Sequence, residues 1–182
     1  MTNVVIISGS TSNNSRLNGL EQEAIAFLNK KGVPYEQITV RELPAEDLIH
    51  AKFDSPAIIA ANEKVEKSDA VIILTPVFKA SYTGVLKAYL DLLPQKGFVD
   101  KSVLPLVIGG SFGHLLMIDY ALKPVISSLG AETVLQGVYV LDKEIERTEE
   151  HRFIVENHVK ERLDKELNRL HSLLSIKELQ LK

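Results

Sequence analysis

The chain has 182 residues and a net charge of −3, with 45% hydrophobic and 25% charged residues. This length and balance fit one domain with a sizeable core, spanning residues 1–182, and the negative charge argues against a broad surface for nucleic acid or anionic membranes. Because the sequence contains no Cys, disulfides, thiolate metal sites and a Cys nucleophile are excluded.

The first residues, MTNVVIISGS, lack the basic region that opens a signal peptide. No apolar run along the chain approaches the roughly 20 residues that a membrane-spanning helix needs. We therefore expect a cytoplasmic protein with no membrane segment.

Apolar, β-branched runs recur along the chain and predict five strands: VVII (4–7), ITV (38–40), AVIILT (70–75), VLPLVI (103–108) and TVLQGVYVL (133–141). The first, third and fourth runs are nearly continuous rather than alternating, which is typical of parallel strands buried on both faces.

The segments between these runs have apolar residues at helical spacing. The first predicted helix begins near Leu17 and stops at Gly32, and the second begins at Pro56 with Ser55 as its cap. The third runs from Val85 and ends at Pro94, and the fourth runs from Leu115 to Leu129 and is closed by Gly130. Residues 148–182 predict a C-terminal amphipathic helix with one apolar stripe, which runs from Val155 to Leu174.

Strands that alternate with helices predict an α/β fold, namely a flavodoxin-like doubly wound five-stranded parallel sheet of order 2-1-3-4-5 with helices on both faces. Ligands of such sheets bind outside the carboxyl ends of the strands. The segments that matter most therefore follow strands 1, 3 and 4: SGSTSNNSR, TPVFKASYTG and GGSFGH.

The first of these loops leads into a helix, so free backbone N–H groups and the positive end of the helix dipole point into it. Ser10, Ser12 and Ser15 offer hydroxyls, Arg16 offers a forked cation, and the loop contains no carboxylate that would repel an anion. It has neither GxxxxGK[ST] nor GxGxxG, so a monophosphate suits it better than a nucleoside triphosphate or a pyrophosphate. A plain Ser/Asn-rich turn that caps a helix explains the loop equally well.

In the second loop, Pro76 ends the strand, Phe78 offers a flat apolar surface and Lys79 a neighbouring cation. Phe78 as an ordinary core residue is a serious alternative. In the third loop, Gly109 and Gly110 let the backbone approach a planar ligand closely.

The third loop also matches GxSxG, with Ser111 where a hydrolase nucleophile would stand. Asp142 and either His151 or His158 follow in a suitable order. Only one strand follows the motif, however, and both His residues lie on the charged predicted helix, so we disfavour a hydrolase.

A phosphate loop, an aromatic-bearing loop and a Gly-rich loop at one sheet edge form a site for a flat phosphorylated ligand, and FMN fits this description. A receiver domain of the same fold would need an acidic cluster after strand 1, and the sequence has none there.

Four stretches resemble the NADPH-dependent FMN reductase family, most of all the flavin reductase component of two-component alkanesulfonate monooxygenase systems: GSTSNNSRL (9–17), EDLIHAKFDSPAI (46–58), TPVFKASYTGVLKAYLDLLP (75–94) and LPLVIGGSFGHLLMIDYALKPVISSLGA (104–131). The resemblance covers about residues 1–142. It implies that NADPH passes a hydride to FMN and that reduced FMN leaves for a partner flavin-dependent monooxygenase in sulfonate sulfur acquisition.

The resemblance also implies a set of binding residues: Ser10, Ser15, Arg16 and Leu17 at the phosphate, Pro76, Val77, Phe78 and Lys79 beside the isoalloxazine, and Gly109, Gly110 and Ser111 on its other side. His114 lies close to the third loop and is a further candidate flavin contact. The sequence departs from the family at two positions, since Ser12 stands where Arg is frequent and Phe78 where Tyr is usual. We assign no catalytic acid or base and no metal site, because the cofactors carry the chemistry.

Reductases of this kind that use FMN as a substrate share a Tyr inserted in the fourth helix, which makes a π-bulge at a subunit interface. Tyr120 in LLMIDYALKPV matches it. Pro124 has no N–H, so the Tyr120 carbonyl loses its usual partner, and a bulge is one remedy. A simple proline kink is the alternative. We expect a homodimer or homotetramer formed through the helices after strands 3 and 4.

Two other flavin functions stay open. In one, FMN is a tightly bound prosthetic group that reduces quinones, azo dyes or metal ions. In the other, the protein is a flavodoxin-like electron carrier with no NADPH site, although such carriers are usually far more acidic than −3.

Overall fold

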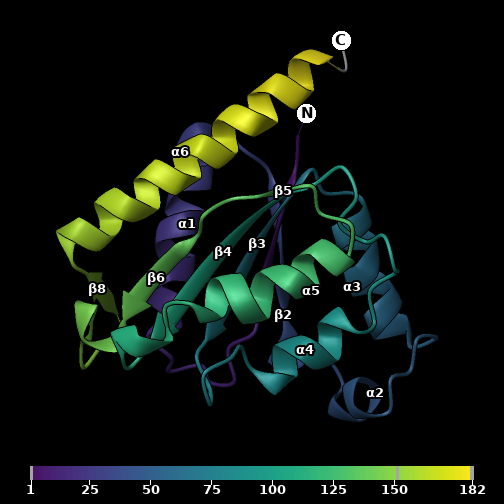
Figure 1. Cartoon of the computed structure of the whole chain (residues 1–182), viewed down its shortest axis with the longest axis horizontal. Helices are drawn as coiled ribbons and strands as arrows, with labels where there is room; N and C mark the ends of the chain where they lie inside the picture. Colours follow the sequence, from purple (N-terminus) through teal and green to yellow (C-terminus); the bar gives the residue numbers. More distant parts are fainter. Residues whose placement is uncertain (1, 151, 181–182) are drawn as a thin grey trace.

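The computed structural model describes residues 2–150 and 152–180, and a parallel sheet forms its centre (Figure 1). The predicted strand order is confirmed. The strands, in spatial order, are β2 (Tyr35–Thr39), β1 (Val4–Ser8), β3 (Ala70–Pro76) and β4 (Ser102–Gly109), with β5 (Thr133–Val134) and β6 (Val138–Leu141) both paired to β4.

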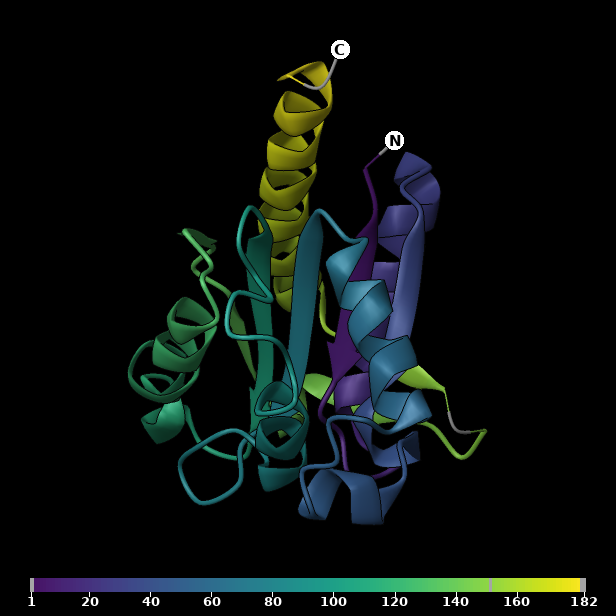
Figure 2. The same ribbon diagram turned by 90° about the vertical axis from the view of Figure 1, so that its right-hand side faces the viewer.

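Helices cover both faces of the sheet. Their bounds are α1 (Leu17–Lys31), α2 (Ala45–Ile49), α3 (Pro56–Glu66), α4 (Gly84–Leu90), α5 (Lys123–Ser128) and α6 (Asn157–Gln180), and three short 3-10 turns span Val40–Glu42, Phe112–His114 and Asp142–Glu144. Figure 2 shows α3 nearer the viewer than the sheet and α6 behind it. Among the described residues, no helix is long and apolar enough to cross a membrane.

The apolar side chains of the strands divide between two core clusters. Val5 and Ile7 of β1 face the side that α3, α4 and α5 cover, whereas Val4 and Ile6 face α1 and α6. All four side chains are fully buried. Burial on both faces is why the sequence of this strand shows no alternation.

The fifth predicted strand, residues 133–141, is interrupted in the middle. Residues 135–137 leave the strand conformation, and Gly137 adopts a positive φ of 85°. A Cβ at Gly137 would lie 2.8 Å from the Pro105 carbonyl oxygen of β4. The close approach to β4 thus requires glycine, and it divides the run into β5 and β6.

The predicted C-terminal helix over 148–182 is wrong at its start. Phe153–Val155 forms β8, which pairs antiparallel with β7 (Ile145–Arg147), and the helix begins at Asn157. Val155 is buried as a strand residue rather than as the first residue of the helical stripe. Residues 151, 181 and 182 of the predicted helix lie outside the described residues.

The helix predicted from Leu115 to Leu129 has two hydrogen-bonding patterns. Ile118–Leu122 is π-helical, and the Lys123 N–H donates to the Ile118 carbonyl five residues earlier. The bulge at Tyr120 is therefore confirmed, and α5 continues it as ordinary helix.

Ser55 precedes α3 and Pro56 is its first residue, as predicted, but the Ser55 side chain does not cap the helix. Its hydroxyl donates instead to Asp47 Oδ2 at 2.7 Å. This bond, with the Lys52 ammonium beside it, lowers the pKa of the Asp47 carboxyl.

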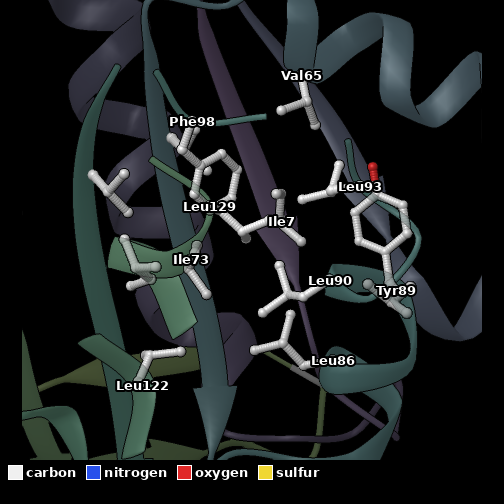
Figure 3. Packing of buried hydrophobic residues seen from close by; sticks show 14 of the residues in the cluster. Ile7, Val65, Ile73, Leu86, Tyr89, Leu90, Leu93, Phe98, Leu122 and Leu129 are labelled. Atoms are coloured by element: carbon white, nitrogen blue, oxygen red, sulfur yellow. The ribbon is translucent and has the colours of Figure 1, made fainter. Parts of the chain in front are cut away.

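Tyr89 of α4 is fully buried among apolar side chains, beside Leu90 and Leu93 in Figure 3. Its hydroxyl has no hydrogen-bond partner among the described residues, and burial raises its pKa. Folding thus removes this hydroxyl from water with no replacement, which costs about 1–3 kcal/mol.

We expect Tyr89→Phe to raise the free energy of unfolding by about 1 kcal/mol, because it removes this uncompensated group. Urea denaturation followed by circular dichroism measures the change. The neighbouring Leu86→Ala serves as the control and should lower stability by about 2–5 kcal/mol. A Tyr89→Phe protein less stable than wild type would show that the hydroxyl has a partner.

Candidate functional site

The loop after β1, residues 9–16, lies against the start of α4. The Gly9 N–H donates to the Leu74 carbonyl at 2.8 Å, and the Gly9 carbonyl accepts from Thr83 Oγ1 at 2.8 Å. A Cβ at Gly9 would lie 2.7 Å from Leu86 Cβ. Gly9 thus permits a close approach that fixes the first loop relative to α4.

Three serines predicted to contact a phosphate brace the first loop internally. The buried Ser10 hydroxyl donates to the Ser12 carbonyl at 2.9 Å, and Ser12 Oγ accepts from the Asn14 N–H at 3.1 Å. Ser15 Oγ accepts from the N–H of Leu17, the first residue of α1, at 3.2 Å. These bonds fix the conformation of the loop at the start of α1.

Four backbone amides of this loop are left without an acceptor among the described residues. Within the described residues, no hydrogen bond is made by the N–H groups of Ser10, Thr11, Asn13 and Arg16. They stand at the amino end of the 15-residue α1, where the helix dipole favours negative charge. The donor set is that of an anion site, with no carboxylate in the loop.

The Arg16 side chain has a partner that the sequence did not indicate. Its Nε donates to the Ile145 carbonyl of β7 at 2.9 Å. Arg16 thus remains beside the loop, and at least part of its guanidinium holds the β7–β8 hairpin.

The second loop forms a tight turn of four residues beginning at Phe78. The Phe78 N–H donates to the Ser81 carbonyl at 2.8 Å, and the Ser81 N–H donates back at 3.1 Å. Lys79 and Ala80 have φ values of 49° and 64°, a left-handed conformation that costs non-glycine residues of order 1 kcal/mol each. Such strain concentrates at binding sites.

The turn projects its aromatic residue outward. The Phe78 side chain is 51% exposed, so it is not an ordinary core residue. Pro76 ends β3 as predicted, and the Val77 N–H donates to the Ile108 carbonyl of β4 at 2.8 Å. This bond holds the second loop against the strand that leads into the third.

The third loop passes over Tyr139 of β6. The buried Tyr139 donates its hydroxyl to the Ser111 carbonyl at 2.6 Å, and its ring meets Phe112 edge-on at 6.2 Å. A Cβ at Gly109 would overlap the Tyr139 hydroxyl and approach Val77 Cγ2 to 3.1 Å. Burial, aided by the Asp142 carboxylate, raises the pKa of Tyr139, so the phenol remains a neutral donor.

The second and third loops enclose an open hollow of roughly 520 Å³. It is lined by Val77, Lys79, Ala80, Gly110, Ser111 and His114. The structure thus brings together part of the set that the resemblance implies for the two sides of a planar ring. The other members of that set, Pro76, Phe78 and Gly109, do not line the hollow.

Two residues that anchor these loops were missed by sequence reasoning. Thr83 is buried, caps α4 through the Leu86 N–H at 3.1 Å and donates to Gly9. Tyr139 supports the Gly-rich loop from the neighbouring strand. Thr83 immediately before a helix was a visible capping signal, whereas nothing local connects Tyr139 with Ser111.

The arrangement expected of a serine hydrolase is not formed. Ser111 Oγ accepts from the Gly113 N–H at 3.2 Å, and no His side chain of the described residues is hydrogen-bonded to it. His158 contacts Glu144 and Glu156 instead, at 3.0 and 3.3 Å. The other candidate, His151, lies outside the described residues.

The chain is similar in sequence to proteins of one known family. Residues 2–146 match the family described as NADPH-dependent FMN reductase. A Pseudomonas putida (strain KT2440) protein named FMN reductase (NADPH) is 46% identical over 142 residues, covering 78% of this chain and 72% of that protein. An Escherichia coli K12 protein of the same name is 42% identical over 142 residues, covering 78% and 74%.

A solved structure gives the same result for the fold. The apo form of the NADH:FMN oxidoreductase EmoB superposes with a TM-score of 0.84 at 33% identity, covering 96% of this chain and 90% of that one.

We expect Thr83→Val to lower the free energy of unfolding by about 2–4 kcal/mol, because it leaves the Gly9 carbonyl unpaired and removes the cap of α4. Urea denaturation measures the loss. Thr83→Ser keeps the hydroxyl and should lose about 1 kcal/mol. A Thr83→Val protein as stable as Thr83→Ser would show that the hydrogen bonds of the hydroxyl contribute no more than the methyl group does.

Proposed function

The chain belongs to the NADPH-dependent FMN reductase family, and we propose that it is an NAD(P)H:FMN oxidoreductase that transfers a hydride from NADPH to FMN. The observation that carries the proposal is the set of unpaired amides in the first loop, at the same sheet edge as the hollow between the second and third loops. A phosphate and a planar ring of one ligand need this pair of features.

The first loop fits the phosphate of FMN. The N–H groups of Thr11, Asn13 and Arg16 supply donors, and the α1 dipole supplies a favourable potential. Because the hydroxyls of Ser10, Ser12 and Ser15 brace the loop, the amides are fixed before the ligand arrives, which reduces the entropic cost of binding.

The second and third loops fit the isoalloxazine. The strained turn offers the N–H groups of Lys79 and Ala80, and the Gly-rich loop offers those of Ser111 and Phe112, none with an acceptor in the described chain. Such donors match the carbonyl oxygens and nitrogens at the edge of a flavin. Gly109 and Gly110 keep side chains out of the way of the ring.

The protein's contribution to the reaction is placement rather than proton transfer. Bound FMN supplies the chemistry, which is acceptance of a hydride and its two electrons from NADPH. The turn at Lys79 and Ala80 and the loop at Ser111 would hold the isoalloxazine in a fixed orientation, in which NADPH can reach it. No residue at the hollow is needed as an acid or base.

We further propose that FMN exchanges with solution and that its reduced form serves a partner flavin-dependent monooxygenase, in sulfonate sulfur acquisition. The openness of the hollow and the π-helical segment at Tyr120 support this proposal. A ligand that must leave after each turnover suits a site built largely from loop backbone.

We propose in addition that the chain forms a homodimer or homotetramer through the segment after β4. Phe112, Leu116 and Tyr120 are 59%, 58% and 79% exposed there. Large apolar residues exposed together are typical of a surface that another protein covers. We expect Leu116→Glu to lower the sedimentation coefficient of the protein. A wild-type protein that sediments as a monomer would contradict the proposal.

The test of the reductase function is NADPH oxidation by the purified protein with free FMN varied. We expect a rate that rises and saturates with FMN, because flavin is consumed and replaced. A rate independent of added FMN, from yellow protein supplied with a quinone or dye, would indicate tightly bound FMN instead. No oxidation under either condition would contradict the proposed reductase.

A further inference from the structure

The first loop and the β7–β8 hairpin hold each other through two reciprocal hydrogen bonds. Arg16 of the loop donates to the Ile145 carbonyl of β7 at 2.9 Å, and Arg147 of β7 donates through Nη1 to the Asn14 carbonyl of the loop at 3.3 Å. Each segment thus supplies one guanidinium and one backbone carbonyl. We call this pair of bonds the arginine clasp.

The hairpin can pack closely against α1 because Gly19 of that helix has no side chain at the contact. A Cβ at Gly19 would lie 3.0 Å from both Ile145 Cγ2 and Phe153 Cβ. Ile145 and Val155 are buried, so the hairpin is anchored in the core on the α1 side of the sheet. The clasp therefore connects the loop to a fixed support.

A third arginine also contacts the loop. Arg41, in the turn after β2, donates through Nε to Asn13 Oδ1 at 2.8 Å, and its side chain is only 22% exposed. Asn18 of α1 donates to the Asn13 carbonyl at 2.7 Å. Both oxygen acceptors of Asn13 are thereby occupied, while its N–H has no protein acceptor.

These contacts fix two peptide planes that lie between the unpaired amides of Asn13 and Arg16. Asn18 binds the Asn13 carbonyl, which shares its plane with the Asn14 N–H. Arg147 binds the Asn14 carbonyl, which shares its plane with the N–H of the following residue. With these two planes fixed, the adjoining backbone that carries the unpaired N–H groups of Asn13 and Arg16 has little rotational freedom. Because an amide must point at its anion to bind it, rotational freedom here would weaken phosphate binding but leave ring binding unchanged.

We propose that Arg41 and Arg147 are positioning residues that hold the first loop in its phosphate-binding conformation and thereby set the preference for FMN over riboflavin. The inference rests on the proposed function, since it concerns the phosphate of the same ligand. Arg147 lies just past the residues 2–146 that match the family, so part of this phosphate selectivity resides in the hairpin.

The test compares dissociation constants for FMN and riboflavin, measured by quenching of flavin fluorescence, in wild type and in Arg41→Met/Arg147→Met. We expect the FMN constant to rise roughly tenfold and the riboflavin constant to change less than about twofold, as loss of ordered charged hydrogen bonds at one end of the ligand predicts. In the same background, Arg41→Met/Arg147→Lys keeps a donor for the Asn14 carbonyl, so it should recover most of the preference for FMN over riboflavin.

Arg152→Ala is the matched control, because Arg152 lies on the same hairpin and contacts Glu150 rather than the loop. It should leave both constants unchanged. If the double variant does not fold, a cycle of Arg41→Met, Asn13→Ala and their combination decides the question through non-additive losses of FMN affinity.

Three outcomes would overturn the inference. Equal weakening of both flavins would show that the arginines support the fold alone, and an unchanged ratio of constants would show that the loop needs no such support. A wild type that binds both flavins equally would remove the phosphate site itself, and with it this part of the proposed function.

Discussion

The parallel pairing of β1, β3 and β4 is the constraint on which the site depends. Because these strands run in one direction with their side chains buried on both faces, their carboxyl ends and the three loops that follow must meet at one edge. The loops are then fixed to one another rather than to the strands alone. Thr83 joins the second loop to Gly9 of the first, and Tyr139 supports the third from β6.

The first loop differs in chemistry from the second and third, and the two ends of a flat phosphorylated ligand need this difference. The charged end needs oriented N–H groups, which the first loop presents at the start of α1. The ring needs backbone that can come close, which the strained turn at Lys79 and Ala80 and the glycines of the third loop provide. A site made largely of backbone can release its ligand without rearranging side chains, which suits the proposed exchange of flavin with solution.

Much of this could be predicted from the sequence because it is local. The strands follow from periodicity, and their order from the fit of alternating strands and helices to a flavodoxin-like fold. The bulge at Tyr120 follows from the resemblance and the missing N–H of Pro124. The partner of Arg16 could not be predicted, since Ile145 lies 129 residues away. The hairpin was missed because Val155 continues the apolar spacing of α6. The cap expected from Ser55 does not form because its hydroxyl binds Asp47 instead. In each case a tertiary contact replaced a local one.

The most direct measurement is a crystal structure of the protein with FMN. The account predicts that the phosphate accepts hydrogen bonds from the N–H groups of Thr11, Asn13 and Arg16, with the isoalloxazine between the turn at Lys79 and the loop at Ser111. A phosphate bound away from the first loop, or a ring outside the hollow, would contradict it.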